Sequence, residues 1–329
     1  MKKRFVFSLL TVILAGPVTA EFRESDTGEK SGLLIMAHGG DEVWNAAVLE
    51  AIRPLRASLP VEVAFGMADP HSLQPAVRRL EEQSVRRIAV VRLFVSAASF
   101  REQTEYFLGL REAPPKHFLL HGGPLPNEEE HYRSGVDPFS LVRLVNSQEQ
   151  PIPPIETDSL IDLNREGLYD SDEIGQILVE RVQSLSKNPL REAILVLAHG
   201  EGDDELNQQW TERIGRLVKG IESVGEFREV RAETLREDWF RKREEAMGRI
   251  RHFFGRHQEA GVSVLVVPFR VFGFGPYRAV LEGLDYVADG KGLLPHLAVT
   301  DWVRQQAEAI FQRNEWANPF QSGDSVGQP

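Results

Sequence analysis

The chain has 329 residues, 42% of them hydrophobic and 26% charged, a composition that supports about two folded domains and excludes a disordered protein. Its formal net charge of −11 argues against a nucleic-acid partner, because such a partner needs a basic face to neutralise phosphates. The absence of cysteine excludes disulfides, thiolate metal sites and cysteine nucleophiles. Any side chain that binds a metal ion is therefore His, Asp or Glu.

The first 20 residues have the form of a signal peptide. A basic stretch at 2–4 precedes an apolar run at 5–15, and the segment ends in small residues up to Ala20. The apolar run is shorter than the roughly 20 residues of a membrane-spanning helix. We therefore expect cleavage near Ala20, no membrane span in the mature chain, and a periplasmic or secreted protein.

Two short apolar segments with the same ending divide the chain into two halves. Residues 32–39 and 193–200 each have the pattern of a strand buried on both faces, and each ends in Ala-His-Gly, at His38 and at His199. Acids and a tryptophan follow both segments: Asp41, Glu42 and Trp44 in the first, and Asp203, Asp204, Glu205 and Trp210 in the second. This recurrence indicates an internal repeat.

Both halves continue with the same order of elements. Strands are expected at 60–65 and 87–95 in the first half and at 229–234 and 262–269 in the second, with helices from about 70 and over 239–259. Each half thus has the order β-α-β-α-β, which predicts an α/β protein with two related, doubly wound parallel sheets. Ligands of such sheets bind beyond the carboxyl ends of the strands, here in a cleft between the halves.

Composition sets the expected domain boundaries. A fourth strand of the first half is expected at 117–121, and a helix at about 172–186 leads into the second half. The expected parts are a signal peptide at 1–20, an N-terminal half at 31–126, a connector at 127–190, a C-terminal half at 191–316 and a disordered tail at 317–329.

The two strand-end histidines are the first candidates for chemistry. Each is followed by a glycine, Gly39 or Gly200, which lets a ligand approach the backbone. The alternative is a structural histidine at the edge of the core that bonds to a neighbouring loop. Because the same Ala-His-Gly ending occurs twice, we favour a functional role for at least one of them.

Six segments of the two halves match a known pattern. The first half contains Leu-Leu-Ile-Met-Ala-His-Gly at 33–39, Val-Glu-Val-Ala-Phe at 61–65, Asp-Pro-His-Ser-Leu at 69–73 and Ile-Ala-Val-Val-Arg-Leu-Phe-Val at 88–95. The second half contains Ile-Leu-Val-Leu-Ala-His-Gly at 194–200 and Val-Leu-Val-Val-Pro-Phe at 264–269. In these segments, which extend over most of the mature chain, the sequence resembles the sirohydrochlorin cobaltochelatases.

The resemblance implies a chelatase fold that inserts Co²⁺, Ni²⁺ or Fe²⁺ into a tetrapyrrole such as sirohydrochlorin. It also implies that a strand-end histidine binds the metal and accepts a proton, with His199 as the main residue and His38 as the secondary one. A neutral imidazole with a pKa near 6.5 suits both tasks. The nearby acids Glu42 and 203–205 either hold incoming ions and relay protons or form solvated loops.

The chain departs from this family in one respect. These chelatases carry a second histidine in a Gly-x-His turn after the third strand, and neither 96–100 nor 270–277 contains one. Convergence of His38 with His199, or substitution by His121 or His296, would compensate. The second turn instead holds aromatic residues, interpreted either as a wall for a macrocycle or as core packing: Phe272, Phe274 and Tyr277.

Other functional classes fit the sequence less well or remain open. A non-catalytic periplasmic protein that binds a tetrapyrrole or a metal on the same fold is the main alternative, and a scaffold role is another. A zinc de-N-acetylase is disfavoured, because Gly40 stands where that family has a zinc-binding Asp. A phosphohistidine phosphatase needs Arg-His-Gly where both halves have Ala-His-Gly. No organic cofactor is predicted, and the metal, the tetrapyrrole and the oligomeric state stay open.

Overall fold

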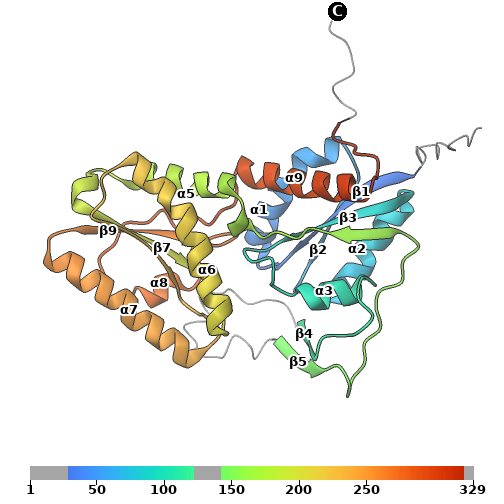
Figure 1. Ribbon diagram of the computed structural model, residues 1–329, viewed down its shortest axis with the longest axis horizontal. Coiled ribbons are helices and arrows are strands. Elements are labelled where there is room, and N and C mark those ends of the chain that lie inside the picture. The colour runs from blue at the N-terminus through green and yellow to red at the C-terminus, as the bar shows by residue number, and fades with distance from the viewer. Residues whose placement is uncertain (1–28, 122–141, 322–329) are drawn as a thin grey trace, which may run out of the picture.

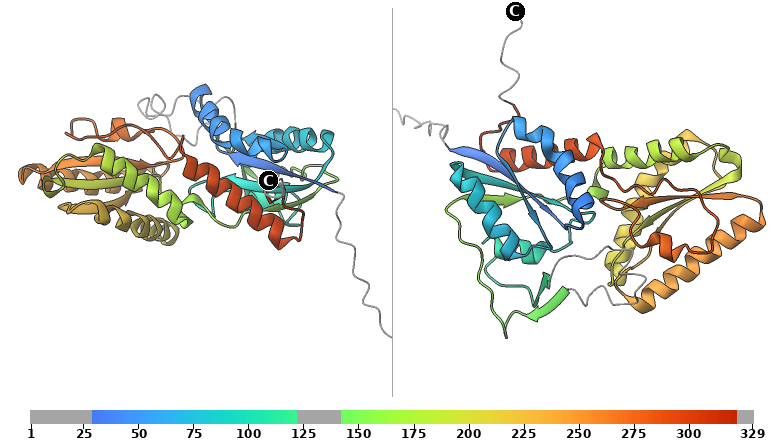
Figure 2. Two further views of the ribbon diagram at one scale, coloured as in Figure 1. Left: turned by 90° about the horizontal axis from the view of Figure 1, so that it is seen from above. Right: turned by 180° about the vertical axis from the view of Figure 1, so that it is seen from behind.

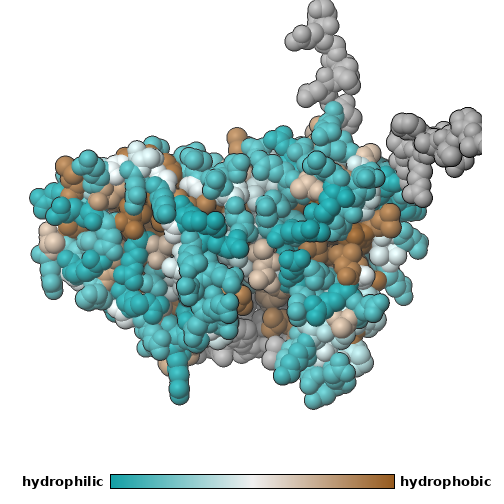
Figure 3. Space-filling view, viewed as in Figure 1, coloured by the Kyte–Doolittle hydropathy of each residue, from teal (hydrophilic) through white to brown (hydrophobic). Residues whose placement is uncertain are grey.

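A computed structural model describes residues 29–121 and 142–321, which form two α/β units side by side (Figure 1). The expected signal peptide lies outside these ranges. Polar side chains cover most of the face shown in Figure 3, as expected for a strongly anionic chain. None of the described helices is both long and apolar enough to cross a membrane.

The first unit is a parallel sheet with strand order β2-β1-β3-β6. Its elements are β1 (Lys30–Ala37), α1 (Glu42–Ile52), β2 (Val61–Phe65), α2 (Pro70–Glu82), β3 (Val85–Leu93), α3 (Arg101–Phe107) and β6 (Leu160–Leu163). Asp41 and Asp69 cap α1 and α2 by accepting the backbone N–H groups of Trp44 and His71, both at 2.8 Å. These caps start the helices just beyond the carboxyl ends of β1 and β2.

The second unit repeats this arrangement, with strand order β8-β7-β9 and parallel pairing throughout. Its elements are β7 (Glu192–Ala198), α6 (Asp204–Leu217), β8 (Glu229–Thr234), α7 (Phe240–Glu259), β9 (Ser263–Phe269) and the short α8 (Tyr277–Val280). Every residue of β7 is buried, as is all of β1 after its first residue. The predicted fold class, two related doubly wound parallel halves, is confirmed.

Two expectations at the edges of the first unit were wrong. The segment 117–121 is a strand, β4 (His117–His121), but it pairs antiparallel with β5 (Val142–Asn146) in a separate sheet. The fourth strand of the main sheet is β6, which the sequence analysis assigned to the connector. β6 has only four residues, too few for a clear periodic pattern, so its place depends on pairing with β3.

The start of the expected disordered tail is also ordered. Phe320 packs against the core, with its ring centroid 6.4 Å from that of Phe311. The Ser31 hydroxyl donates a hydrogen bond to the carbonyl of Ala317 at 3.0 Å. Residues 317–321 therefore belong to the folded protein, and only 322–329 lie beyond the described range.

The two units exchange helices. α5 (Asp172–Leu185) follows the first unit along the chain but packs on β9 and α6 of the second. α9 (Leu297–Arg313) follows the second unit but packs on β3 and α1 of the first (Figure 1, Figure 2). The Thr300 hydroxyl at the start of α9 donates to the carbonyl of Ala51 in α1 at 2.7 Å. One hydrophobic cluster therefore includes buried side chains of both units.

The segments that lead into α5 and α9 correspond to each other. Each contains a glycine that lies close to the backbone of another segment. A Cβ on Gly167 would lie 2.4 Å from the carbonyl oxygen of Val95, after β3. A Cβ on Gly292 would lie 2.8 Å from the carbonyl oxygen of Arg270, after β9. In each case a helix begins five residues later, since 172 − 167 = 5 and 297 − 292 = 5. The internal repeat thus extends through α5 and α9.

Candidate functional site

The two histidines occupy the same position in their units, one residue beyond the carboxyl end of β1 or β7. Gly39 and Gly200 follow with φ of +83° and +84°, a conformation that favours glycine. The Nδ1 atoms of His38 and His199 lie 2.9 and 2.8 Å from the carbonyl oxygens of these glycines. A neutral imidazole that donates from Nδ1 carries its lone pair on Nε2, the form that binds metal ions.

The carboxylates closest to His199 do not come from residues 203–205, which the sequence analysis named. The Nε2 atom of His199 lies 3.1 Å from Asp238 Oδ2 and 3.9 Å from Glu237 Oε2. Burial lowers the pKa of His199, but the charges of Asp238 and Glu237 outweigh it and raise the pKa from 6.5 to about 10. In the metal-free protein His199 and Asp238 therefore form an ion pair at neutral pH.

The loop between β8 and α7 brings these acids to the histidine. The N–H of Leu235 donates to the carbonyl of Ala198 at 2.8 Å, and the N–H of Arg236 donates to the carbonyl of His199 at 2.6 Å. Arg236 has a φ of +58°, so the chain turns sharply just before Glu237 and Asp238. The sequence analysis did not name Asp238, although this acid follows the carboxyl end of a strand that it predicted.

Glu201 is a third acid in this neighbourhood. Burial raises the pKa of Glu201, and the charges of Asp238 and Asp203 raise it further against the opposing effect of His199. Burial likewise raises the pKa of Asp238, but the charges of His199, His38 and Arg270 outweigh it and hold that pKa below its ordinary value. The acids around His199 are thus electrostatically coupled to each other and to both histidines.

The acid of the first unit that corresponds to Asp238 has a structural role. Where the second unit has Asp238 after β8, the first has Asp69 after β2, and the Asp69 carboxylate caps α2. The charge of His38 nevertheless acts on Asp238. The fold thus brings the two histidines within electrostatic reach of the same carboxylate, that of Asp238 in the second unit.

The acids that the sequence analysis named have structural partners or lie in solvent. Asp203 caps α6 by accepting the N–H groups of Glu205 and Leu206, both at 3.0 Å. Asp204 pairs with Arg236 at 2.6 Å and Lys242 at 2.7 Å. Glu42 and Glu205 are exposed. Asp203 and Asp204 thus have structural partners near the start of α6, and Glu42 and Glu205 lie in solvent.

The two histidines proposed as substitutes do not supply a further ligand among the described side chains. His296 caps α9 through Nδ1 and lies 2.9 Å from Glu180 through Nε2, in the region of the exchanged helices. The side chain of His121 lies outside the part of the structure that is described. Across 29–121 and 142–321, no three His, Asp or Glu side chains are arranged to hold a metal ion.

The aromatic turn after β9 packs into the protein. Tyr277 is fully buried, and Phe274 is buried and stacked on Tyr286 with ring centroids 6.0 Å apart. Phe272 is half-buried against the main core. This placement supports the core-packing interpretation and not the macrocycle wall. Glycines in the turn suggested an open surface, but the apolar rings are buried beneath it.

Two tryptophans flank His199 instead. The ring of Trp210 lies 6.4 Å from the imidazole, and the half-buried ring of Trp239 lies 6.3 Å away at an interplanar angle of 89°. Gly202 makes room for Trp239, because a Cβ there would lie 2.1 Å from the indole. The sequence analysis noted Trp210 but missed Trp239, which follows Asp238 directly.

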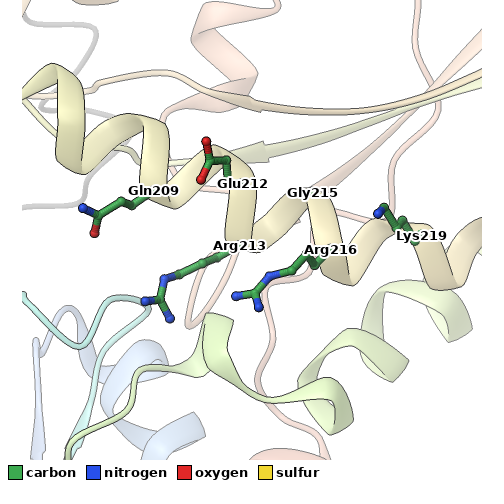
Figure 4. Close-up of a pocket in the computed structure, with 6 residues that line it drawn as sticks. All are labelled: Gln209, Glu212, Arg213, Gly215, Arg216 and Lys219. Carbon is green, nitrogen blue, oxygen red and sulfur yellow. The ribbon is translucent and has the colours of Figure 1, made fainter.

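A cavity of about 530 Å³ runs along α6, and neither histidine is among its lining residues (Figure 4). Its lining residues come from α6 and the turn that follows: Gln209, Glu212, Arg213, Gly215, Arg216 and Lys219. Arg213 contacts Asp170 and lies over the Tyr169 ring, 5.0 Å from its centroid. Arg213 thus has partners in the segment before α5, and the groove is separate from the histidine site.

Comparisons with known proteins support the fold described above. A family model described as CbiX matches residues 32–125, whereas no curated protein matches the chain. The structure of SirB from Bacillus subtilis with Fe³⁺ aligns with a TM-score of 0.54 and 12% identity, covering 88% of this chain and 99% of that one. The multi-domain protein DR2241 from Deinococcus radiodurans, titled as similar to chelatases, aligns with a TM-score of 0.47 and 15% identity, covering 85% of this chain and 55% of that one. The first unit thus carries the CbiX sequence pattern, and the chain as a whole has the chelatase fold.

Proposed function

We propose that this protein is a metal chelatase of the sirohydrochlorin cobaltochelatase type, which inserts Co²⁺, or Ni²⁺ or Fe²⁺, into a tetrapyrrole. The observation that carries the proposal is the contact of 3.1 Å between His199 Nε2 and Asp238 Oδ2 at the carboxyl edge of β7. The chelatase fold and the CbiX pattern of residues 32–125 support the same conclusion.

The chemistry needs a site that binds a divalent ion and removes protons. Insertion replaces two pyrrole N–H protons with one metal ion, so two protons leave for each ion that enters. His199 Nε2 binds the ion when the ring is neutral, and Asp238 offsets part of the ion's charge. After the ion has moved to the macrocycle, the imidazole accepts one of the released protons and pairs again with the Asp238 carboxylate, and the other proton passes to solvent.

His38 and Trp239 complete the proposed site. His38 approaches from the first unit, close enough for its charge to act on Asp238, and serves as a secondary ligand or proton acceptor. Trp239 stands perpendicular to the His199 ring. We assign the indole to stacking on the macrocycle, because a flat aromatic ring beside the proposed ligand suits a flat aromatic substrate.

A second candidate function is tetrapyrrole or metal binding without insertion. It is favoured by one observation: neither turn after the third strand contains a histidine, so His199 and Asp238 form a smaller ligand set than the family pattern provides. On this view the protein carries a metal ion or a macrocycle in the periplasm and releases it unchanged.

One experiment separates the two functions. The purified mature protein is incubated with sirohydrochlorin and Co²⁺ or Fe²⁺, and the Soret and Q bands are followed beside a protein-free sample and the His199→Ala variant. Spectral conversion faster than both controls supports the chelatase. A band shift on macrocycle binding with no conversion supports the carrier. Absence of both a shift and conversion rejects the chelatase and the tetrapyrrole carrier.

A further inference from the structure

Glu237 lies beside the metal-binding pair but belongs to a different contact. Its carboxylate is 9% exposed, and its Oε2 atom is 3.9 Å from His199 Nε2, against 3.1 Å for Asp238. Arg270 Nη1 donates to both Glu237 oxygens, at 2.7 and 2.8 Å. The carboxylate closest to the site after that of Asp238 is therefore held by a cation from the end of β9.

The residues around Arg270 hold its side chain against Glu237. Its side chain is 12% exposed, and its guanidinium lies 5.4 Å from the centroid of the buried Tyr277 ring. Gly275 leaves room for it, because a Cβ there would lie 2.6 Å from the guanidinium carbon. The Arg270 carbonyl also accepts the N–H of Leu293 at 2.7 Å, in the segment that leads to α9.

We propose that Arg270 is a positioning residue that withholds Glu237 from the metal and so keeps the site weak. With Glu237 bound to Arg270, His199 and Asp238 are left as the pair that meets the ion. This agrees with the lack of any three-residue His, Asp and Glu metal cluster in 29–121 and 142–321. Without Arg270, a small rotation would bring Glu237 to the ion as a third ligand.

A weak site suits a protein that must give its metal away. An additional carboxylate would tighten the bound state of the ion without helping its transfer, so release would slow. This part of the inference rests on the proposed chelatase function. The effect on metal affinity does not, because it follows from the number of carboxylates that reach His199.

The test measures Co²⁺ affinity by calorimetry in the absence of any macrocycle. Arg270→Met keeps much of the side-chain volume and removes the charge, and we expect it to bind Co²⁺ about tenfold more tightly, the scale on which outer contacts change metal affinity. In the insertion assay the same variant should show a lower KM for Co²⁺ together with a lower kcat. A residue needed only for folding would weaken binding instead.

Three further variants make the test specific. Arg270→Lys keeps the cation and should retain the parent affinity, and the double variant with Glu237→Gln should lose the gain seen in Arg270→Met. Glu237→Gln alone should bind Co²⁺ within about threefold of the parent. Weaker binding in a folded Arg270→Met, or a large loss in Glu237→Gln, would overturn the inference. If tight Co²⁺ binding appears but no variant inserts metal, the proposed function fails and the inference on Arg270 stands.

Discussion

The imidazole of His199 and the carboxylate of Asp238 are in contact although the strand and the loop that carry them are separated along the chain by α6 and β8. The contact depends on the parallel pairing of β7 with β8, which places Ala198 opposite Thr234. A histidine after one strand and an acid after the next thus meet at the carboxyl edge of the sheet. Variants of this pair therefore test both the fold and the proposed function.

His199→Ala removes the main ligand and proton acceptor together. We expect the rate of metal insertion to fall by about 10²–10⁴-fold, the usual effect of losing a general base. His38→Ala should reduce the rate less, because the 3.1 Å contact with Asp238 is made by His199. Initial rates and Co²⁺ affinities are measured for both variants, with thermal melting as the control. A His199→Ala protein that folds normally and matches the parent would contradict the assignment.

The same pair makes stability depend on pH. The pKa of His199 is about 10 in the folded protein against 6.5 for an ordinary histidine. Because this pKa is raised on folding, protonated His199 stabilises the folded protein. The stabilisation is complete below pH 6.5 and is lost as the pH rises through about 10. Urea unfolding of the parent at these two pH values should therefore show a loss that His199→Gln lacks. Equal losses in the two proteins would mean that the ion pair does not form.

Trp239 is expected to bind the macrocycle and not the metal. Trp239→Ala should weaken binding of metal-free sirohydrochlorin about 3- to 10-fold, from the typical energy of one aromatic pair. Trp239→Phe should weaken it less. Soret-band titration without metal measures this effect, and Phe240→Ala, which removes the neighbouring ring that is 66% exposed, is the matched control. Unchanged binding in Trp239→Ala would move the macrocycle site elsewhere.

Gly167 is expected to be essential for the junction of the two units. A Cβ there would lie 2.4 Å from the Val95 oxygen and 2.5 Å from the Ala97 nitrogen. Gly167→Ala should therefore cost about 1–3 kcal/mol in the free energy of unfolding, the usual range for overpacking. Gly248→Ala in α7, where a Cβ meets nothing within 4 Å, should stabilise by up to about 1 kcal/mol. Urea denaturation of both variants checks the difference, and a Gly167→Ala protein as stable as the parent would refute it.

Export is expected from the first 20 residues, which lie outside the described structure. We propose that the mature protein begins at or close to Glu21 and lies in the periplasm or outside the cell. N-terminal sequencing of protein from the periplasmic and secreted fractions tests this. Recovery of intact Met1 in the cytoplasmic fraction would reject it.

The sequence predicted the strands best where burial is complete. The apolar runs that became β1 and β7 have an unmistakable pattern, and their shared ending located both histidines. The sequence did not predict β6, because this strand has only four residues and its first residue is exposed. Its place in the sheet depends on pairing with β3. A periodic pattern shows which face of an element is buried, but not which element covers it. The exchange of α5 and α9 was therefore not predictable.

The same limit of local patterns applied to the candidate site. His38 and His199 could be proposed from the sequence because their signal is local, whereas Asp238 and Arg270 act on residues distant in sequence. Asp238 also resembles an ordinary helix start, and a helix does begin at Phe240. Tyr277 and Phe274 show the opposite error, because aromatic residues near glycines suit both a ligand wall and a core, and only their burial distinguishes the two.

The exchange of helices also sets the order in which the protein can fold. The sheet that contains β1 and β3 is complete in its strands after β6, yet one of its faces waits for α9 at residues 297–313. During synthesis the part of this face beside α1 therefore stays uncovered until almost the whole described chain has been made. The first unit therefore reaches its final packing only after the second unit has been synthesised.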